Sequence, residues 1–328
     1  MKEILSHHQA RQRLWSAMRN GALHHAYLFE GPRGVGKSLV ALRLVQAANC
    51  DSGEPCGICA TCQAIANNRH PDIIFVEPDP TRATPIISVD AIREVVRQTT
   101  YHRYGSKRRF VIIDPAEAMQ VGAANALLKT LEEPPPYTGF ILIANHAKAL
   151  LPTIVSRCQR TRFGAVASDE LEQWLNEQGV DQASIVAHLS QGCPGRALEL
   201  ADGGLEQRLQ RRDNLLGVLN GPLDGIFEWS RKICDGKKRQ QWMVEVEAIL
   251  EVVEDLLRDV VILGCGADKC LLNGDATALV EQWGKALWPY GVVRANDALN
   301  EARAQLRLNV SGRTVIDALL TTLRQELS

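Results

Sequence analysis

The sequence lacks a strong excess of charge of either sign. Its formal net charge is −1 over 328 residues, because 37 Lys and Arg nearly balance 38 Asp and Glu. A protein that binds nucleic acid through a broad surface carries a large positive excess, so any DNA contact has to be local or shared with other subunits. Hydrophobic residues make up 45% of the chain, which is ordinary for a globular protein with a sizeable core.

Long apolar runs are also absent. No stretch has the roughly 20 apolar residues that a membrane-spanning helix needs. The first residues, "MKEILSHHQARQRLW", lack the apolar core and the cleavage site of a signal peptide. We therefore expect a cytoplasmic protein with no membrane partner, in which cysteines stay reduced. The histidines form no catalytic cluster.

Apolar strand patterns alternate with helical patterns in the first half of the chain. Such alternation predicts a three-layer α/β domain with a parallel sheet and right-handed crossovers, which we assign to residues 1–165. A helix is expected at 88–100, capped by Ser88, and another at 124–133, stopped by three prolines. The expected strands precede the glycine-rich loop at 31–38 and occupy residues 71–78, 109–114, 139–145 and 160–163.

The strand pattern disappears after about residue 165. Short capped helices that end in glycine predict a small helical domain at 166–204, and the rest of the chain, 205–328, is expected to be all helical. Two stripes of apolar residues at helical spacing predict core-facing helices there, which could also pack against neighbouring subunits. The stripes are Trp242, Val246, Ile249, Val253, Leu256, Val260 and Leu263, then Ile316, Leu320, Leu323 and Leu327.

The segment "GPRGVGKS", residues 31–38, fits the pattern of a phosphate-binding loop between a strand and a helix. Its glycines, Gly31, Gly34 and Gly36, let backbone N–H groups curl round a phosphate without Cβ clashes. Lys37 is expected to reach the terminal phosphates, and the hydroxyl of Ser38 to hold Mg²⁺. ATP or ADP with Mg²⁺ is therefore the expected ligand, although a loop of this shape could also have lost tight binding.

Polar residues follow the third and fourth expected strands. Asp114 ends one of them, and we interpret it as a second magnesium ligand rather than a helix cap. An efficient ATPase would be expected to carry a glutamate next, but Pro115 supplies no carboxylate. Glu117 is expected to cap the following helix, so hydrolysis should be slow or absent. Asn145 is either a γ-phosphate or water contact or a turn residue, and the pattern leaves both open.

Four cysteines crowd into the segment "CDSGEPCGICATC". Cys50, Cys56, Cys59 and Cys62 have the spacing C-x5-C-x2-C-x2-C, which can close a tetrahedral thiolate shell round Zn²⁺. Reduced cysteines in the cytosol argue against disulfides, and free thiols remain the alternative. With no group marking an open coordination position, we expect a structural zinc in an insertion at 50–62.

Arg157 follows the fourth strand at the expected rim of the α/β domain. From there an arginine does not easily reach its own phosphate loop, but it could reach the loop of an adjacent subunit. A guanidinium delivered in this way neutralises charge on a transferring phosphoryl group. By position alone, the plainer alternative of a surface salt bridge would be preferred.

Taken together, the motifs resemble one family, the bacterial clamp-loader ATPases of the AAA+ class. They are "HHAYLFEGPRGVGKS", the four-cysteine insertion, "HPDI", "NALLKTLEEPP" and "SRC", and they cover about residues 5–200. The resemblance implies an AAA+ P-loop domain, a helical lid and a C-terminal helical domain that joins an oligomeric collar. It also implies that Arg157, within the intact Ser-Arg-Cys motif, acts in trans. The mechanical role of "KTLEEPP" does not follow from the pattern.

Two departures set the chain apart from the family's motor subunits, the gamma/tau type. The motors have Asp-Glu where this chain has Asp114-Pro115, and they have a lid arginine where it has Gly195, with Arg196 shifted by one position. The resemblance therefore implies a stator subunit with little intrinsic ATPase, within a DNA polymerase III loader of delta and gamma/tau subunits. Such a loader opens a sliding clamp and places it on primed DNA. A gamma/tau-type motor and a zinc-stabilised scaffold that binds no nucleotide are the alternatives.

Overall fold

The computed structural model describes residues 5–79, 86–267, 271–308 and 310–327. Contacts between residues divide the chain into two compact units. Unit 1 comprises the described residues up to Ala183 together with Ser190–Leu198, and unit 2 comprises Ser184–Leu189 and the described residues from Glu199 onward. The three-domain division made from the sequence, with boundaries at 165/166 and 204/205, stays a prediction.

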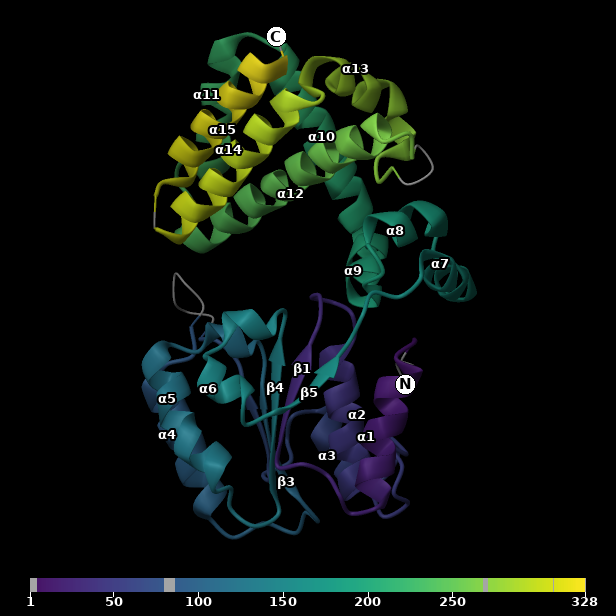
Figure 1. Cartoon of the computed structure of the whole chain (residues 1–328), viewed down its shortest axis with the longest axis vertical. Helices are drawn as coiled ribbons and strands as arrows, with labels where there is room; N and C mark the ends of the chain where they lie inside the picture. The colour runs from purple at the N-terminus through teal and green to yellow at the C-terminus, as the bar shows by residue number, and fades with distance from the viewer. Residues whose placement is uncertain (1–4, 80–85, 268–270, 309, 328) are drawn as a thin grey trace. The chain divides into compact units, whose positions relative to one another are not determined.

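The core of unit 1 is a parallel sheet of five strands, as the sequence predicted (Figure 1). The strand order is β2-β3-β4-β1-β5, so β1, which precedes the glycine-rich loop, lies between β4 and β5. The parallel order places the carboxyl ends of all five strands along one edge. The strands are β1 (Ala26–Glu30), β2 (Ile73–Val76), β3 (Arg109–Ile113), β4 (Thr138–Ala144) and β5 (Gln159–Arg162).

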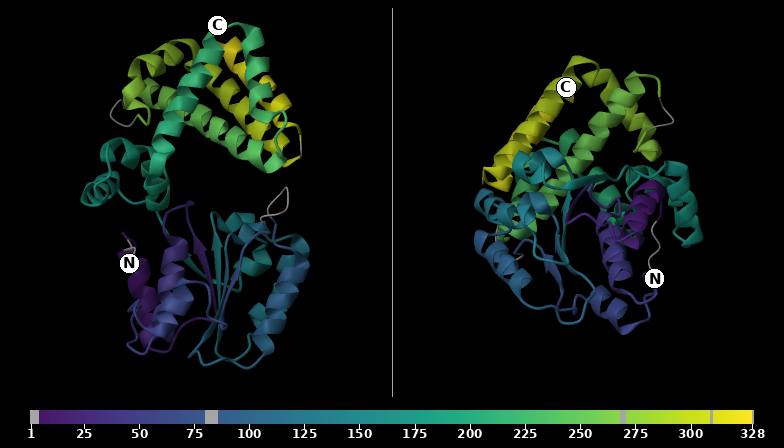
Figure 2. Two further views of the ribbon diagram at one scale, coloured as in Figure 1. Left: turned by 180° about the vertical axis from the view of Figure 1, so that it is seen from behind. Right: turned by 60° about the horizontal axis from the view of Figure 1, so that its bottom comes forward.

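Helices cover both faces of this sheet, which gives the predicted three layers (Figures 1 and 2). Alternate strand residues point to opposite faces, so Leu28 and Val111 pack against one helical layer while Phe29 and Ile112 pack against the other. The first layer contains α4 (Val89–Thr100), α5 (Val121–Glu132) and the short α6 (Pro152–Val155). The second contains α1 (His8–Arg19), α2 (Lys37–Asn49) and α3 (Ala60–Ala66).

Local sequence determines where helices begin and end in unit 1. Ser88 caps α4, since its hydroxyl accepts a hydrogen bond from the backbone N–H of Ala91 at 3.2 Å, as predicted. Prolines follow the end of α5 and prevent its continuation. Beyond β5, the chain continues into α7 (Ser168–Glu177), α8 (Ala183–Leu189) and α9 (Pro194–Glu199).

Unit 2 is helical throughout its described residues from 199 onward, apart from short connections. The first predicted apolar stripe lies on α12, where Val246, Ile249, Val253, Leu256 and Val260 are all buried. The second lies on α15, so both stripes form core as expected. No helix among the described residues is long and apolar enough to span a membrane. The helices are α10 (Leu205–Asn220), α11 (Leu223–Cys234), α12 (Arg239–Gly264), α13 (Thr277–Leu287), α14 (Tyr290–Arg307) and α15 (Gly312–Leu327).

Candidate nucleotide site, cysteine cluster and surface arginine

The glycine-rich loop connects the end of β1 to the start of α2, the arrangement expected of a phosphate loop. Gly31, Gly34 and Gly36 have φ angles of +156°, +81° and +108°, a region that favours glycine. A Cβ on Gly31 would lie 2.2 Å from the carbonyl oxygen of Phe163, so that position has no room for a side chain. The first turn of a helix leaves backbone N–H groups without partners inside the helix, and α2 begins directly after this loop, so such groups can meet a phosphate.

Lys37 is the first residue of α2, and its side chain turns back into the loop. Its Nζ donates hydrogen bonds to the carbonyl oxygens of Gly31 at 2.6 Å and Pro32 at 2.8 Å. Burial lowers the pKa of Lys37, while the negative charges of Asp114 and Glu117 act in the opposite direction. A cation held between loop carbonyls beside two carboxylates is suited to meet phosphate oxygens.

Ser38 and Asp114 come together although 76 positions separate them in the sequence. The hydroxyl of Ser38 donates a hydrogen bond to Oδ2 of Asp114 at 2.5 Å. Asp114 directly follows β3, and Ser38 is the second residue of α2. The two oxygen groups predicted to hold Mg²⁺ are therefore adjacent, and their hard oxygen ligands suit that ion.

Glu117 does not cap the helix that follows, so that prediction was wrong. It lies inside the 3₁₀ turn η1 (Ala116–Ala118), and its Oε1 accepts a hydrogen bond from the backbone N–H of Asn145 at 3.0 Å. That N–H directly follows strand β4, whereas α5 begins after Gln120, which makes no side-chain cap hydrogen bond. Oε2 of Glu117 is buried without a hydrogen-bond partner among the described residues. Residue 117, rather than 115, therefore supplies a second carboxylate whose charge acts on Lys37 together with that of Asp114.

Part of the segment after α8 lies directly against the phosphate loop. The backbone N–H of Gly195 donates a 2.7 Å hydrogen bond to the carbonyl oxygen of Gly34. A Cβ on Gly195 would stand 2.9 Å from that oxygen, closer than real Cβ atoms come, and 3.0 Å from the Cα of Gly34, which is also unusually tight. The sequence had marked Gly195 only as the replacement for an arginine, and nothing in the pattern indicated this close contact of two backbones.

The four predicted zinc ligands form one cluster. Their sulfur atoms all lie within 4.8 Å of one another. Individual Sγ–Sγ distances are 3.5 Å for Cys50–Cys56 and 3.9 Å for both Cys50–Cys59 and Cys56–Cys62. Backbone N–H groups point at two sulfurs, from Cys59 to Cys56 at 3.5 Å and from Cys62 to Cys59 at 3.3 Å. N–H donors stabilise thiolates, so the donor set fits a tetrahedral Zn²⁺.

Arg157 lies on the surface of unit 1, just after α6. Its side chain is 33% exposed and forms an ion pair with Glu132 at the end of α5. It also donates a hydrogen bond to the carbonyl oxygen of Thr153 at 2.9 Å. None of its described hydrogen bonds goes to its own phosphate loop. The arginine is thus engaged locally and accessible, while its action in trans stays a prediction.

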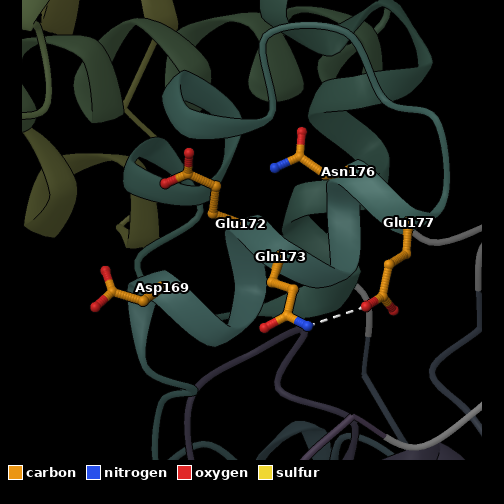
Figure 3. A pocket seen from close by; sticks show the side chains of 5 residues that line it. All are labelled: Asp169, Glu172, Gln173, Asn176 and Glu177. Atoms are coloured by element: carbon orange, nitrogen blue, oxygen red, sulfur yellow. Dashed lines mark hydrogen bonds between the residues drawn. The ribbon is translucent and has the colours of Figure 1, made fainter.

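A shallow hollow on α7 is separate from these sites. It is lined by Asp169, Glu172, Gln173, Asn176 and Glu177, and Figure 3 shows their side chains projecting from that helix. Its one internal hydrogen bond runs from Gln173 to Glu177 at 3.1 Å. The hollow includes none of the predicted nucleotide or metal residues.

Comparison with known proteins identifies the family to which the chain belongs. A family model described as DNA polymerase III, delta subunit, matches residues 6–167. The DNA polymerase III subunit delta′ of Pseudomonas aeruginosa is 39% identical over 247 residues, which are 68% of this chain and 74% of that protein. The chain belongs to the DNA polymerase III clamp-loader AAA+ family. This membership confirms the family and fold class that the motifs implied.

Within this clamp-loader family, the two Bacillus subtilis relatives differ in how much of their length the chain matches. The delta′ subunit of Bacillus subtilis is 30% identical over 324 residues and is matched across 94% of its length, with 95% of this chain. The tau subunit of the same organism is 32% identical over 66% of this chain, but only 37% of tau is matched. A gamma subunit-related protein from Thermotoga maritima superposes with a TM-score of 0.52 at 20% identity, covering 97% of this chain and 100% of the other, which supports the fold.

Proposed function

We propose that this chain is the delta prime, or stator, subunit of a DNA polymerase III clamp loader. The observation that carries the proposal is the match to a delta′ protein along 94% of its length, against about a third of a tau protein. Its partners are gamma/tau and delta subunits, and through the assembled loader the sliding clamp and primed DNA. Within the loader it helps to place the clamp on primed DNA.

The chain's own nucleotide site binds ATP or ADP with Mg²⁺ and hydrolyses ATP little. The folded loop, the buried Lys37 and the Ser38–Asp114 pair support nucleotide binding. Low hydrolysis is supported by Pro115 and by Gly195, which replaces a lid arginine of the motors. Asn145, whose backbone binds Glu117, leaves its side chain available to a terminal phosphate or water. Bound nucleotide then serves as a structural ligand or weak regulator.

Arg157 donates an arginine finger to the ATP site of a neighbouring subunit. This role is supported by its exposure, its place at the rim of unit 1, and the intact Ser-Arg-Cys motif. The zinc held by the four cysteines has a structural role, because a complete thiolate shell leaves no open position for substrate.

The deciding experiment is reconstitution with delta and gamma/tau subunits, with ATPase activity measured before and after mixing. Arg157→Ala should leave the chain folded and able to co-purify with its partners, while ATP turnover at the neighbouring site falls by about a thousandfold, as for other fingers supplied in trans. An unchanged turnover in the loader that contains Arg157→Ala would refute the finger role.

The alternative of a gamma/tau-type motor is supported by one specific observation, the carboxylate of Glu117, whose charge acts on Lys37 as that of Asp114 does. Steady-state ATP turnover by the isolated chain separates the two functions: robust hydrolysis that Lys37→Ala abolishes would favour the motor. Equilibrium binding of a fluorescent ATP analogue, with and without that substitution, tests the further alternative of a scaffold that binds no nucleotide.

A further inference from the structure

The motif "KTLEEPP", residues 129–135, contains a carboxylate whose contacts give the motif a role. Glu132 is the last residue of α5, and its Oε1 accepts a hydrogen bond from Nε of Arg157 at 2.8 Å. Nη2 of Arg157 contacts the same oxygen. One carboxylate oxygen therefore receives two donors from one side of the guanidinium group. The two residues are 25 positions apart, so tertiary structure alone brings them together.

Glu132 is poorly placed to stabilise its own helix. A negative charge in the last turn of a helix interacts unfavourably with the helix dipole. The ion pair adds little stability in return, because its side chains are 33% and 48% exposed and solvent weakens such pairs. Stability therefore does not explain a carboxylate here, whereas its contact with Arg157 does.

The surrounding chain fixes the carboxylate in place. Prolines at 134–136 end α5 directly after Glu133, so the last helical residue cannot shift by continued winding. The short helix α6 packs against α5 and leads into Arg157. On the other side of the guanidinium, Nη1 donates to the carbonyl oxygen of Thr153 at 2.9 Å and to Oγ of Ser156 at 3.4 Å. Arg157 is thus held on two sides.

We propose that Glu132 is a positioning residue for Arg157. It fixes the plane of the guanidinium group. The N–H of Nη2 that does not face Glu132 is then directed outward, to a phosphate oxygen of a nucleotide bound by the adjacent subunit. A side chain oriented in advance loses less conformational freedom when the neighbouring site closes, and stabilises developing charge without reorganising. The inference rests on the proposed finger role of Arg157.

The test uses the loader reconstituted with Glu132→Ala, Glu132→Gln and the matched control Glu133→Gln. Glu133 is the next residue of the motif, is exposed, and makes no ion pair among the described residues. Misplacing a catalytic group by about 1 Å can cost about a hundredfold, so Glu132→Ala should lower kcat by about ten- to a hundredfold with KM for ATP unchanged. Glu132→Gln keeps an acceptor oxygen, so its kcat should lie between those of Glu132→Ala and the unmodified chain. Glu133→Gln should behave as the unmodified chain.

A second comparison separates failure of this inference from failure of the finger itself. In a chain that already carries Arg157→Ala, Glu132→Ala should cause no further loss, because the two residues act as one unit. If Arg157→Ala lowers kcat but Glu132→Ala leaves it unchanged or raises it, Glu132 does not position the finger. The proposal would also be overturned if Glu132→Ala lowered kcat by the same factor in chains with and without Arg157. If Arg157→Ala itself left kcat unchanged, the finger role would be rejected instead.

Discussion

The cysteine cluster makes a quantitative prediction about zinc. A tetrahedral site with Zn–S bonds of about 2.3 Å has sulfur–sulfur edges of about 3.8 Å. Three Sγ–Sγ distances in the cluster, 3.5, 3.9 and 3.9 Å, lie close to that value. The sulfurs are thus spaced for a four-thiolate ion with little rearrangement, and we expect one Zn²⁺ per chain.

The perturbation is Cys59→Ser, which removes one of the four sulfurs. Loss of an outer-shell partner already lowers metal affinity by about 10- to 100-fold, so loss of a direct ligand should lower it by more. Because metal-binding energy at a structural site contributes to folding, unfolding of unit 1 should also occur at a lower temperature. Cys265→Ser is the control, since that thiol is exposed and lies outside the cluster.

The assay is elemental analysis of chain purified under reducing conditions, followed by competition with a colorimetric chelator and by thermal unfolding. Cys265→Ser should bind zinc and unfold at the same temperature as the unmodified chain. Cys59→Ser should contain less zinc and unfold at a lower temperature. A chain that contains no zinc after equilibration with the ion, or a Cys59→Ser variant that holds it as tightly as the unmodified chain, would refute the reasoning from these distances.

Three further predictions concern the rest of unit 1. Lys37→Ala should weaken binding of a fluorescent ATP analogue by about 10- to 100-fold, the value of one charged hydrogen bond, whereas binding unaffected by it would contradict the phosphate role. Gly195→Ser should force the backbones at 195 and 34 apart and speed hydrogen exchange in the phosphate loop; identical exchange rates would show that the contact is dispensable. Asp72→Asn should lower the free energy of unfolding by about 3–5 kcal/mol, because buried Arg109 loses its 2.9 Å ionic partner. Burial raises the pKa of Asp72, but hydrogen bonds from Ser106 and Arg109 outweigh it and hold the pKa below its usual value. Urea denaturation should therefore show the Asp72 contribution in full above its unfolded pKa of about 3.9 and its loss as pH falls through the lower folded value; a pH-independent difference from Asp72→Asn would contradict this.

The sequence predicted those parts of the fold that depend on local patterns. Short apolar strands, the glycine-rich loop, the Ser88 cap and the cysteine spacing each carry their information within a few residues. Glu117 was misplaced because its partner, the N–H of Asn145, is 28 positions away, just beyond the end of β4. The contact of Gly195 with Gly34 and the pairing of Glu132 with Arg157 were missed for the same reason: helical periodicity and turn chemistry say nothing about which distant backbones or side chains meet.

Helix α2 joins two of these features directly. It is 13 residues long, about 20 Å, and begins with Lys37 and ends immediately before Cys50. This mostly buried helix therefore has the lysine of the predicted phosphate loop at its first position and is followed directly by a cysteine of the predicted zinc site. If both sites bind as predicted and a shift of α2 couples them, thermodynamic reciprocity requires nucleotide to change zinc affinity by the same factor by which zinc changes nucleotide affinity.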